Sequence, residues 1–97
     1  MRIAEVIGTV TLSRVHPSLV GYRWILGVPY SLTALEQGGR GDGEDLVLFD
    51  NLGAGNGQQI AFSEGGEAAA PFHPVKKAID AYCGCILDSI TVTGIKP

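Results

Sequence analysis

The chain has 97 residues, of which 45% are hydrophobic and 18% are charged, and its net charge at pH 7 is −3. This length predicts one domain, residues 1–97, with a thin core, because a chain of this size hides only about 60–70% of its unfolded surface. The apolar excess excludes intrinsic disorder and favours self-association, while the negative charge disfavours binding to nucleic acid or to an anionic membrane.

Two strands are predicted in the first third of the chain. Residues 2–12 alternate between apolar and polar side chains, with Val6 and Val10 on one parity, which is typical of a half-buried strand. Residues 19–28 are rich in β-branched and aromatic side chains and end at Pro29, so we expect a second strand, antiparallel to the first.

The middle of the chain alternates glycine-rich loops with short apolar runs. Residues 36–45 hold four glycines and five charged residues, a composition that predicts a flexible surface loop. Residues 46–49 and 60–62 are apolar and predict two short strands, which flank a turn cluster at 51–57.

The last third combines a helical signal with a final strand. Residues 64–70 contain three successive alanines and predict one or two helical turns, and residues 76–82 could equally form a short helix by composition. Residues 83–93 are apolar and predict a fifth strand. Five short strands without a repeated βαβ unit favour an all-β fold with one short helix, a small OB-like five-stranded barrel that is closed or nearly closed.

The most conspicuous local motif is the glycine-rich run 53–57, which invites comparison with a phosphate-binding loop. A Walker loop requires Lys and then Ser or Thr after its last glycine, but Gln58 and Gln59 occupy those positions. The spacing also fails the dinucleotide-binding fingerprint. We therefore expect a turn that needs positive φ angles or a close approach of another backbone.

The remaining candidate side chains favour structural roles. His16 and His73 each precede a proline and lack a partner at metal-ligand spacing, so we expect solvated loop histidines. Cys83 and Cys85 are expected on one face of the last strand as buried, reduced thiols. Tyr22 and Trp24 could form a stacking platform for single-stranded nucleic acid, but core or interface packing is the preferred interpretation.

Neither catalysis nor membrane insertion is indicated. The acidic residues are scattered, and no convergent acid, base or nucleophile pair is visible, so we expect no catalytic residue, no metal site and no cofactor. Arg2 and Glu5 interrupt the apolar run that a signal peptide needs, and no run approaches the roughly 18 residues of a membrane span. These features predict a cytoplasmic protein.

Several stretches resemble, in the same order, the EutN/CcmL family of pentameric vertex proteins of bacterial microcompartment shells. The resemblance involves residues 1–10 as a first strand, 16–21 before a second strand, and 79–90 as a final strand. Residues 53–60, GAGNGQQI, are similar to the family signature GAGxGxxV, with Ile60 replacing the usual valine. The chain departs from the family at Ala78, where proline is common, and at residues 82–85, where small aliphatic residues are usual.

The resemblance implies a homopentamer with a narrow central pore that caps the vertices of a shell built from hexameric and pseudohexameric shell proteins. It implies no catalysis and a location in the microcompartment shell. Within this framework the residues expected at the subunit interface or in a pore loop are Gly53, Ala54, Gly55, Asn56 and Gly57. The alternative is a small OB-type binding module for nucleic acid or for a protein partner.

Overall fold

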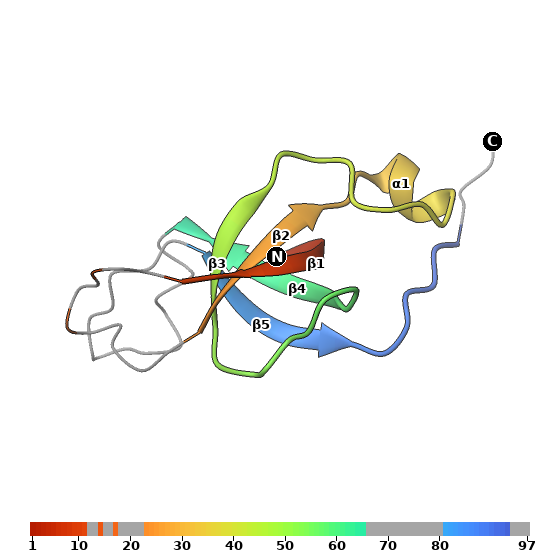
Figure 1. Ribbon diagram of the computed structural model, residues 1–97. Helices are drawn as coiled ribbons and strands as arrows, with labels where there is room; N and C mark the ends of the chain where they lie inside the picture. Colours follow the sequence, from red (N-terminus) through yellow and green to blue (C-terminus); the bar gives the residue numbers. More distant parts are fainter. Residues whose placement is uncertain (12–13, 15–16, 18–22, 66–80, 94–97) are drawn as a thin grey trace.

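The computed structural model describes residues 1–11, 14, 17, 23–65 and 81–93. These residues form five strands and one short helix, and Figure 1 shows the helix beside one end of the sheet. In chain order the elements are β1 (Arg2–Val10), β2 (Arg23–Pro29), α1 (Leu32–Glu36), β3 (Leu46–Asp50), β4 (Gln59–Glu64) and β5 (Ala81–Leu87).

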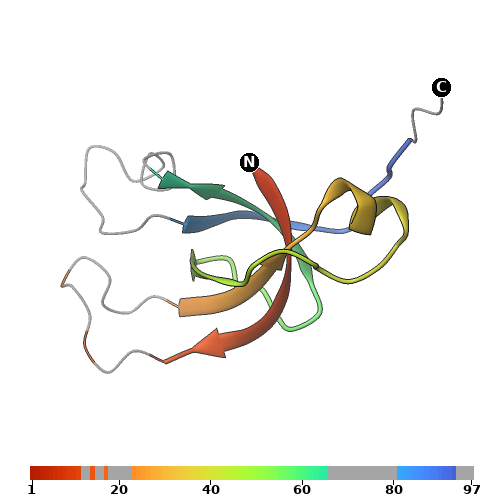
Figure 2. The same ribbon diagram turned by 90° about the horizontal axis from the view of Figure 1, so that it is seen from above.

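The five strands form a closed barrel in the order β1-β2-β3-β5-β4, with β4 returning to β1. All neighbouring pairs are antiparallel except β3 and β5, which run parallel and meet at Phe49 and Tyr82. Figure 2, the view from above, shows the strands curving around a common interior. The predicted all-β, five-stranded barrel with one short helix is therefore confirmed.

Apolar side chains from every strand fill the barrel interior. The buried cluster consists of Ala4, Val6, Ile25, Leu48, Ala54, Ile60, Phe62, Ala81 and Cys83. Gly27 also faces this interior, where an added Cβ would lie 2.8 Å from Leu48 Cδ1. The narrow interior of a small barrel leaves no room for a side chain at this position.

A β-bulge interrupts the pairing of β1 with β2. The register shifts between Val6 and Gly8, so that Thr9 lies opposite Ile25 and Val10 lies opposite Trp24. The predicted alternation nevertheless holds beyond the bulge, because Thr9 and Thr11 are exposed and Val10 is partly buried. The exception is Glu5, which belongs to the predicted polar face and is buried.

The helix lies where no helix was predicted. Ser31 caps α1, because its hydroxyl accepts a hydrogen bond from the Ala34 N–H at 3.1 Å. Asp42 holds Ser31 in turn, accepting from its N–H at 2.8 Å and from its hydroxyl at 2.6 Å. Helical turns were predicted at 64–70. This prediction is wrong at Glu64, which is the last residue of β4, and residues 66–70 lie outside the described part of the chain.

The glycine-rich segment 36–45 makes specific contacts with the barrel. Glu5 of β1 is only 9% exposed, and its carboxylate accepts from Gly41 N–H at 3.1 Å and pairs with Arg40 at 3.2 Å. Gly43 N–H donates to Pro29 O at 2.8 Å. Composition alone predicted a segment without such contacts, and the pairing with Glu5 is not visible in sequence because 35 residues separate Arg40 from it.

The last strand is shorter than predicted and contains a second bulge. β5 covers Ala81–Leu87, and residues 88–93 are not strand. The register with β4 shifts so that Phe62 pairs with Cys83 whereas Ala61 pairs with Cys85, which places the extra residue at Gly84. The alternative of a helix at 76–82 is wrong at Ala81 and Tyr82, and residues 76–80 lie outside the description.

The contacts of Asp42 predict a pH-dependent contribution to stability. Hydrogen bonds from the Ser31 side chain and backbone hold the pKa of Asp42 below its usual value. The stabilisation is therefore complete above the unfolded-state pKa of about 4 and is lost as the pH falls through the folded-state value. We expect the melting temperature of the wild type to be higher than that of Asp42→Asn at pH 6, and the difference between the two melting temperatures to shrink below about pH 4. Circular dichroism melting from pH 3 to 7 measures it, and a difference that stays constant to pH 3 would contradict the assignment.

Candidate functional site

The loop between β3 and β4 contains the glycine-rich motif, and its backbone explains two of the three glycines. Gly53 and Gly57 both have φ of +84°, a left-handed conformation that favours glycine, whereas Gly55 does not have positive φ. Gly57 N–H donates to Val6 O at 2.8 Å and so extends the pairing of β1 with β4. A positive φ, one of the two predicted reasons for glycine, is therefore confirmed at Gly53 and Gly57. It does not apply at Gly55, where a close approach of another backbone stays a prediction.

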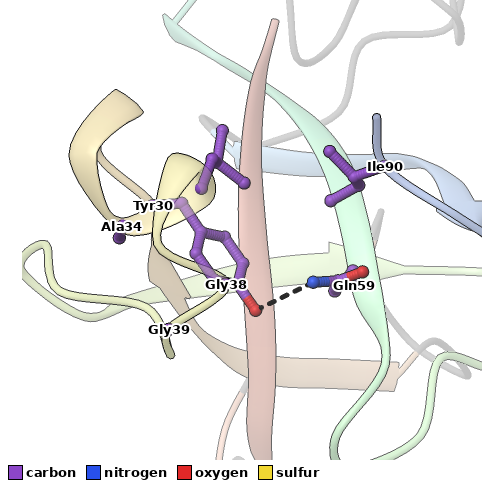
Figure 3. Close-up of a pocket in the computed structure, with 7 residues that line it drawn as sticks. Tyr30, Ala34, Gly38, Gly39, Gln59 and Ile90 are labelled. Atoms are coloured by element: carbon purple, nitrogen blue, oxygen red, sulfur yellow. Dashed lines mark hydrogen bonds between the residues drawn. The ribbon is translucent and has the colours of Figure 1, made fainter. Parts of the chain in front are cut away.

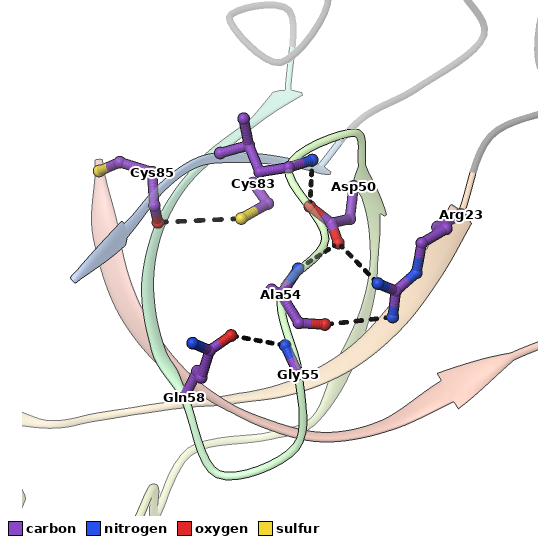
Figure 4. Close-up of polar contacts among 8 residues, drawn as sticks. Arg23, Asp50, Ala54, Gly55, Gln58, Cys83 and Cys85 are labelled. Atoms are coloured by element: carbon purple, nitrogen blue, oxygen red, sulfur yellow. Dashed lines mark hydrogen bonds and ion pairs between the residues drawn. The ribbon is translucent and has the colours of Figure 1, made fainter. Parts of the chain in front are cut away.

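A buried carboxylate organises this loop (Figure 4). Asp50, the last residue of β3, is 0% exposed. Its two oxygens accept from Leu52 N–H and from Ala54 N–H, each at 2.9 Å. Because a buried charge is costly unless it is hydrogen-bonded or paired, these donors are part of what permits Asp50 to stand inside the barrel.

Arg23 completes the arrangement from the neighbouring strand. Its Nη1 lies 4.0 Å from Asp50 Oδ2, and its Nη2 donates to Ala54 O at 3.1 Å. The Arg23 side chain is 46% exposed, so this ion pair has one partner at the surface and the other, Asp50, in the barrel interior. Both the N–H and the C=O of Ala54 are thus held by charged side chains, and the Ala54 methyl group packs in the core.

Sequence reasoning did not single out Asp50 or Arg23. Asp50 had a local signal, because an Asp that precedes a glycine-rich run commonly accepts from the backbone two residues later. Arg23 had none, since its partner Ala54 is 31 residues away and the two meet only through the pairing of β2 with β3.

The expected site residues occupy different environments. Gly53, Asn56 and Gly57 are exposed, Gly55 is half-buried, and Ala54 is fully buried and presents no side-chain surface. Among the described residues, a Cβ built on Gly55 would meet its nearest atom, Gln58 Oε1, at 3.7 Å, which is ordinary contact. The chain itself therefore gives no steric reason for glycine at this position, and approach by another chain stays a prediction.

The two cysteines face different directions, contrary to the sequence interpretation. The bulge at Gly84 separates them, so that Cys83 is buried in the core and Cys85 is half-buried (Figure 4). Burial, followed by the charge of Asp50, raises the pKa of the Cys83 thiol to about 12. Cys83 is therefore an unreactive core residue at neutral pH.

A small cavity lies between α1 and β4 at one end of the barrel (Figure 3). Its volume is about 130 Å³, and it is lined by Tyr30, Ala34, Gln59 and Ile90 among others. The two polar side chains bind each other, since Gln59 Nε2 donates to the Tyr30 hydroxyl at 3.3 Å. Among the described residues that line it, none supplies a carboxylate, imidazole or thiol for acid–base or nucleophilic chemistry.

Other predicted features can be placed only in part. Within the described ranges, no group of three or more His, Cys, Asp and Glu residues could hold a metal ion, and no helix could span a membrane. His16, His73 and Tyr22 lie outside the description. Trp24 packs edge-on against Phe49, with ring centroids 5.5 Å apart, and Phe49 contacts Tyr82 at 5.9 Å, which agrees with the packing role preferred for Trp24.

Comparison with known proteins places the whole barrel in one family. The model of the family described as ethanolamine utilisation protein EutN/carboxysome matches residues 1–88. The carboxysome shell vertex protein CcmL of Gloeobacter violaceus is 32% identical over 92 residues, which cover 95% of this chain and 87% of the relative.

Solved structures give the same result. The structure of Gloeobacter violaceus CcmL superposes with a TM-score of 0.80 at 30% identity and covers 95% of this chain and 90% of the other. The GrpN pentameric microcompartment shell protein of Rhodospirillum rubrum superposes with a TM-score of 0.79 at 28% identity, covering 96% of this chain and 100% of the other.

The different environments of the two thiols predict a two-step labelling reaction. At pH 8 a thiol with a pKa of about 12 is ionised in roughly one molecule in ten thousand, and the Cys83 sulfur is also buried. Native protein should therefore react with iodoacetamide at Cys85 and not at Cys83, with the second equivalent reacting only after unfolding. Peptide mass spectrometry locates the label, and Cys85→Ser should abolish native labelling. Equal rates at both thiols in the native state would contradict the structure.

Proposed function

This chain belongs to the EutN/CcmL family, and we propose that it is a structural shell subunit that caps the vertices of a bacterial microcompartment as a homopentamer. The carrying observation is a match over almost the whole chain, in sequence and in fold, to proteins named as shell vertex or pentameric shell proteins. The family is structural, so the protein is a shell component and not an enzyme.

The surface of the single chain supports assembly. Among the residues that the structure describes, the large apolar side chains that are at least 39% exposed are Met1, Ile7, Leu32, Val47 and Leu52. A ring of five requires each subunit to offer two different, complementary surfaces, and closure of the ring buries both of them. Burial in such a ring would remove from water part of this apolar area, which a chain of 97 residues cannot cover by itself, without requiring every one of these side chains to lie in a contact.

The glycine-rich loop is proposed as part of that contact. The residues Gly53, Ala54, Gly55, Asn56 and Gly57 contribute mainly through backbone, because the Ala54 side chain is buried within its own barrel. The support is Gly55, whose φ and surroundings within the described chain would both accept a side chain. Close approach of a second chain, at the subunit interface or around the axis, would account for it.

The partners that we propose are hexameric and pseudohexameric shell proteins, and the location is the microcompartment shell within the cytoplasm. A five-fold unit among hexagonal tiles supplies the curvature that closes a flat sheet. Nucleic acid is not a proposed partner, because the net charge is −3 and Arg2, Arg23 and Arg40 each pair with a carboxylate of the same chain.

The vertex function predicts both a mass and a phenotype of assembly. Native mass spectrometry should give about five times the chain mass of 10.2 kDa. Co-expression with hexameric shell proteins should give closed particles, and omission of this chain should leave open or elongated assemblies. A dominant monomer at micromolar concentration, or equal closure with and without the chain, would contradict the proposal.

Gly55→Val tests the contact role of the loop. We expect the barrel to keep its circular dichroism spectrum, because the nearest described atom to the new Cβ would be 3.7 Å away, while the pentamer dissociates. Gly53→Val is the comparison, since a side chain at φ of +84° costs on the order of 1–2 kcal/mol within the chain itself. If native mass spectrometry shows that Gly55→Val forms an unchanged pentamer, the proposal that this loop lies at the subunit interface is contradicted.

A further inference from the structure

Burial of the Asp50 carboxylate costs desolvation free energy, and packing of the barrel does not require a carboxylate at this position. Asp50 stands at 0% exposure beside the apolar core, and its negative charge raises the pKa of Cys83 further. An apolar residue of similar volume would serve packing as well or better, since buried ion pairs often contribute little to stability. What Asp50 provides is control over the loop that follows it.

That control fixes the loop on both sides of Gly53. Asp50 binds the N–H groups of Leu52 and Ala54 at 2.9 Å each, and Arg23 binds Ala54 O at 3.1 Å. Leu52, held by its backbone in this way, leaves its side chain 48% exposed. An exposed apolar side chain on an already ordered loop loses little conformational entropy when a partner covers it.

Several backbone N–H groups of this loop are already hydrogen-bonded within the chain. Of residues 51–58, five donate their backbone N–H within the chain: Leu52, Ala54, Gly55, Gly57 and Gln58. An N–H that is already bonded can be removed from water by a partner without becoming an unsatisfied donor. At these five positions a protein contact would leave no backbone donor unsatisfied.

We propose that Asp50 and Arg23 are positioning residues that hold Leu52 as an apolar contact to the adjacent copy of this chain. This inference rests on the pentamer of the proposed function. A second copy is the occupant because Gly55, three residues from Leu52 on the same fixed loop, has no reason within the described chain to be glycine. The contact is thus continuous with the interface proposed for residues 53–57.

The first test compares two apolar side chains of similar exposure. Leu52→Ser should raise the concentration at which the pentamer half-dissociates about tenfold or more, as expected for loss of a buried Leu contact. Val47→Ser is the matched control, because Val47 is 41% exposed on the outer face of β3 and is not part of the loop. It should change dissociation less than about threefold, measured by sedimentation velocity and native mass spectrometry.

The second test asks whether Asp50 acts through Leu52. Asp50→Asn keeps the shape but removes the charge, and it should speed hydrogen exchange at the Leu52 and Ala54 amides and weaken the pentamer. In the Leu52→Ser background the same change should have little further effect on dissociation, because the positioned side chain is gone. If Asp50→Asn does not fold, Arg23→Gln replaces it, since the Arg23 side chain is 46% exposed.

The outcomes separate this inference from the function on which it rests. A wild-type chain that is not pentameric would overturn the proposed function. A wild-type pentamer that Leu52→Ser leaves intact would overturn only the positioning role, as would fully additive effects of Asp50→Asn and Leu52→Ser. A larger effect of Val47→Ser than of Leu52→Ser would also overturn it and would assign the contact to the outer face of β3.

Discussion

The barrel depends on β4, which pairs with β1 on one side and with β5 on the other. Without it the meander of β1, β2 and β3 would be an open sheet with exposed strand edges, a known route to uncontrolled association. In the described part of the chain, the remaining seam, between β3 and β5, is paired at Phe49 and Tyr82. The aromatic contacts of Phe49 with Trp24 and Tyr82 therefore reinforce the junction with the least backbone pairing.

Closure of the barrel also determines the position of Asp50 and Arg23 relative to the loop that follows β3. β3 ends at Asp50 inside the barrel, and pairing of β2 with β3 places Arg23 directly opposite it. The carboxylate can then bind the backbone of the following loop, which keeps Ala54 in the core and leaves Leu52 at the surface. A polar interaction in the interior thus fixes the course of a surface loop, the loop that we propose for the subunit contact.

The errors of the sequence interpretation share a physical origin. Alternation correctly predicted strands at both ends of the chain, but it did not predict the bulge at Gly84, which places Cys83 and Cys85 in different environments. The helix at Leu32–Glu36 was missed because five residues carry too little periodicity to detect, and its cap depends on Asp42, which is remote from Ser31 in sequence. Each feature depends on hydrogen bonds between separate segments.

The sequence alone determined the fold class, the glycine turn and the family, because strand periodicity, glycine placement and motif order are local properties of the chain. The tertiary structure alone decided that Gly55 needs no positive φ, that Cys83 and Cys85 face apart, and that Asp50 and Arg23 hold the loop. The physical reason is that these features arise from strand register and from burial. Both are set when distant segments pair, and neither is written in the residues of any one segment.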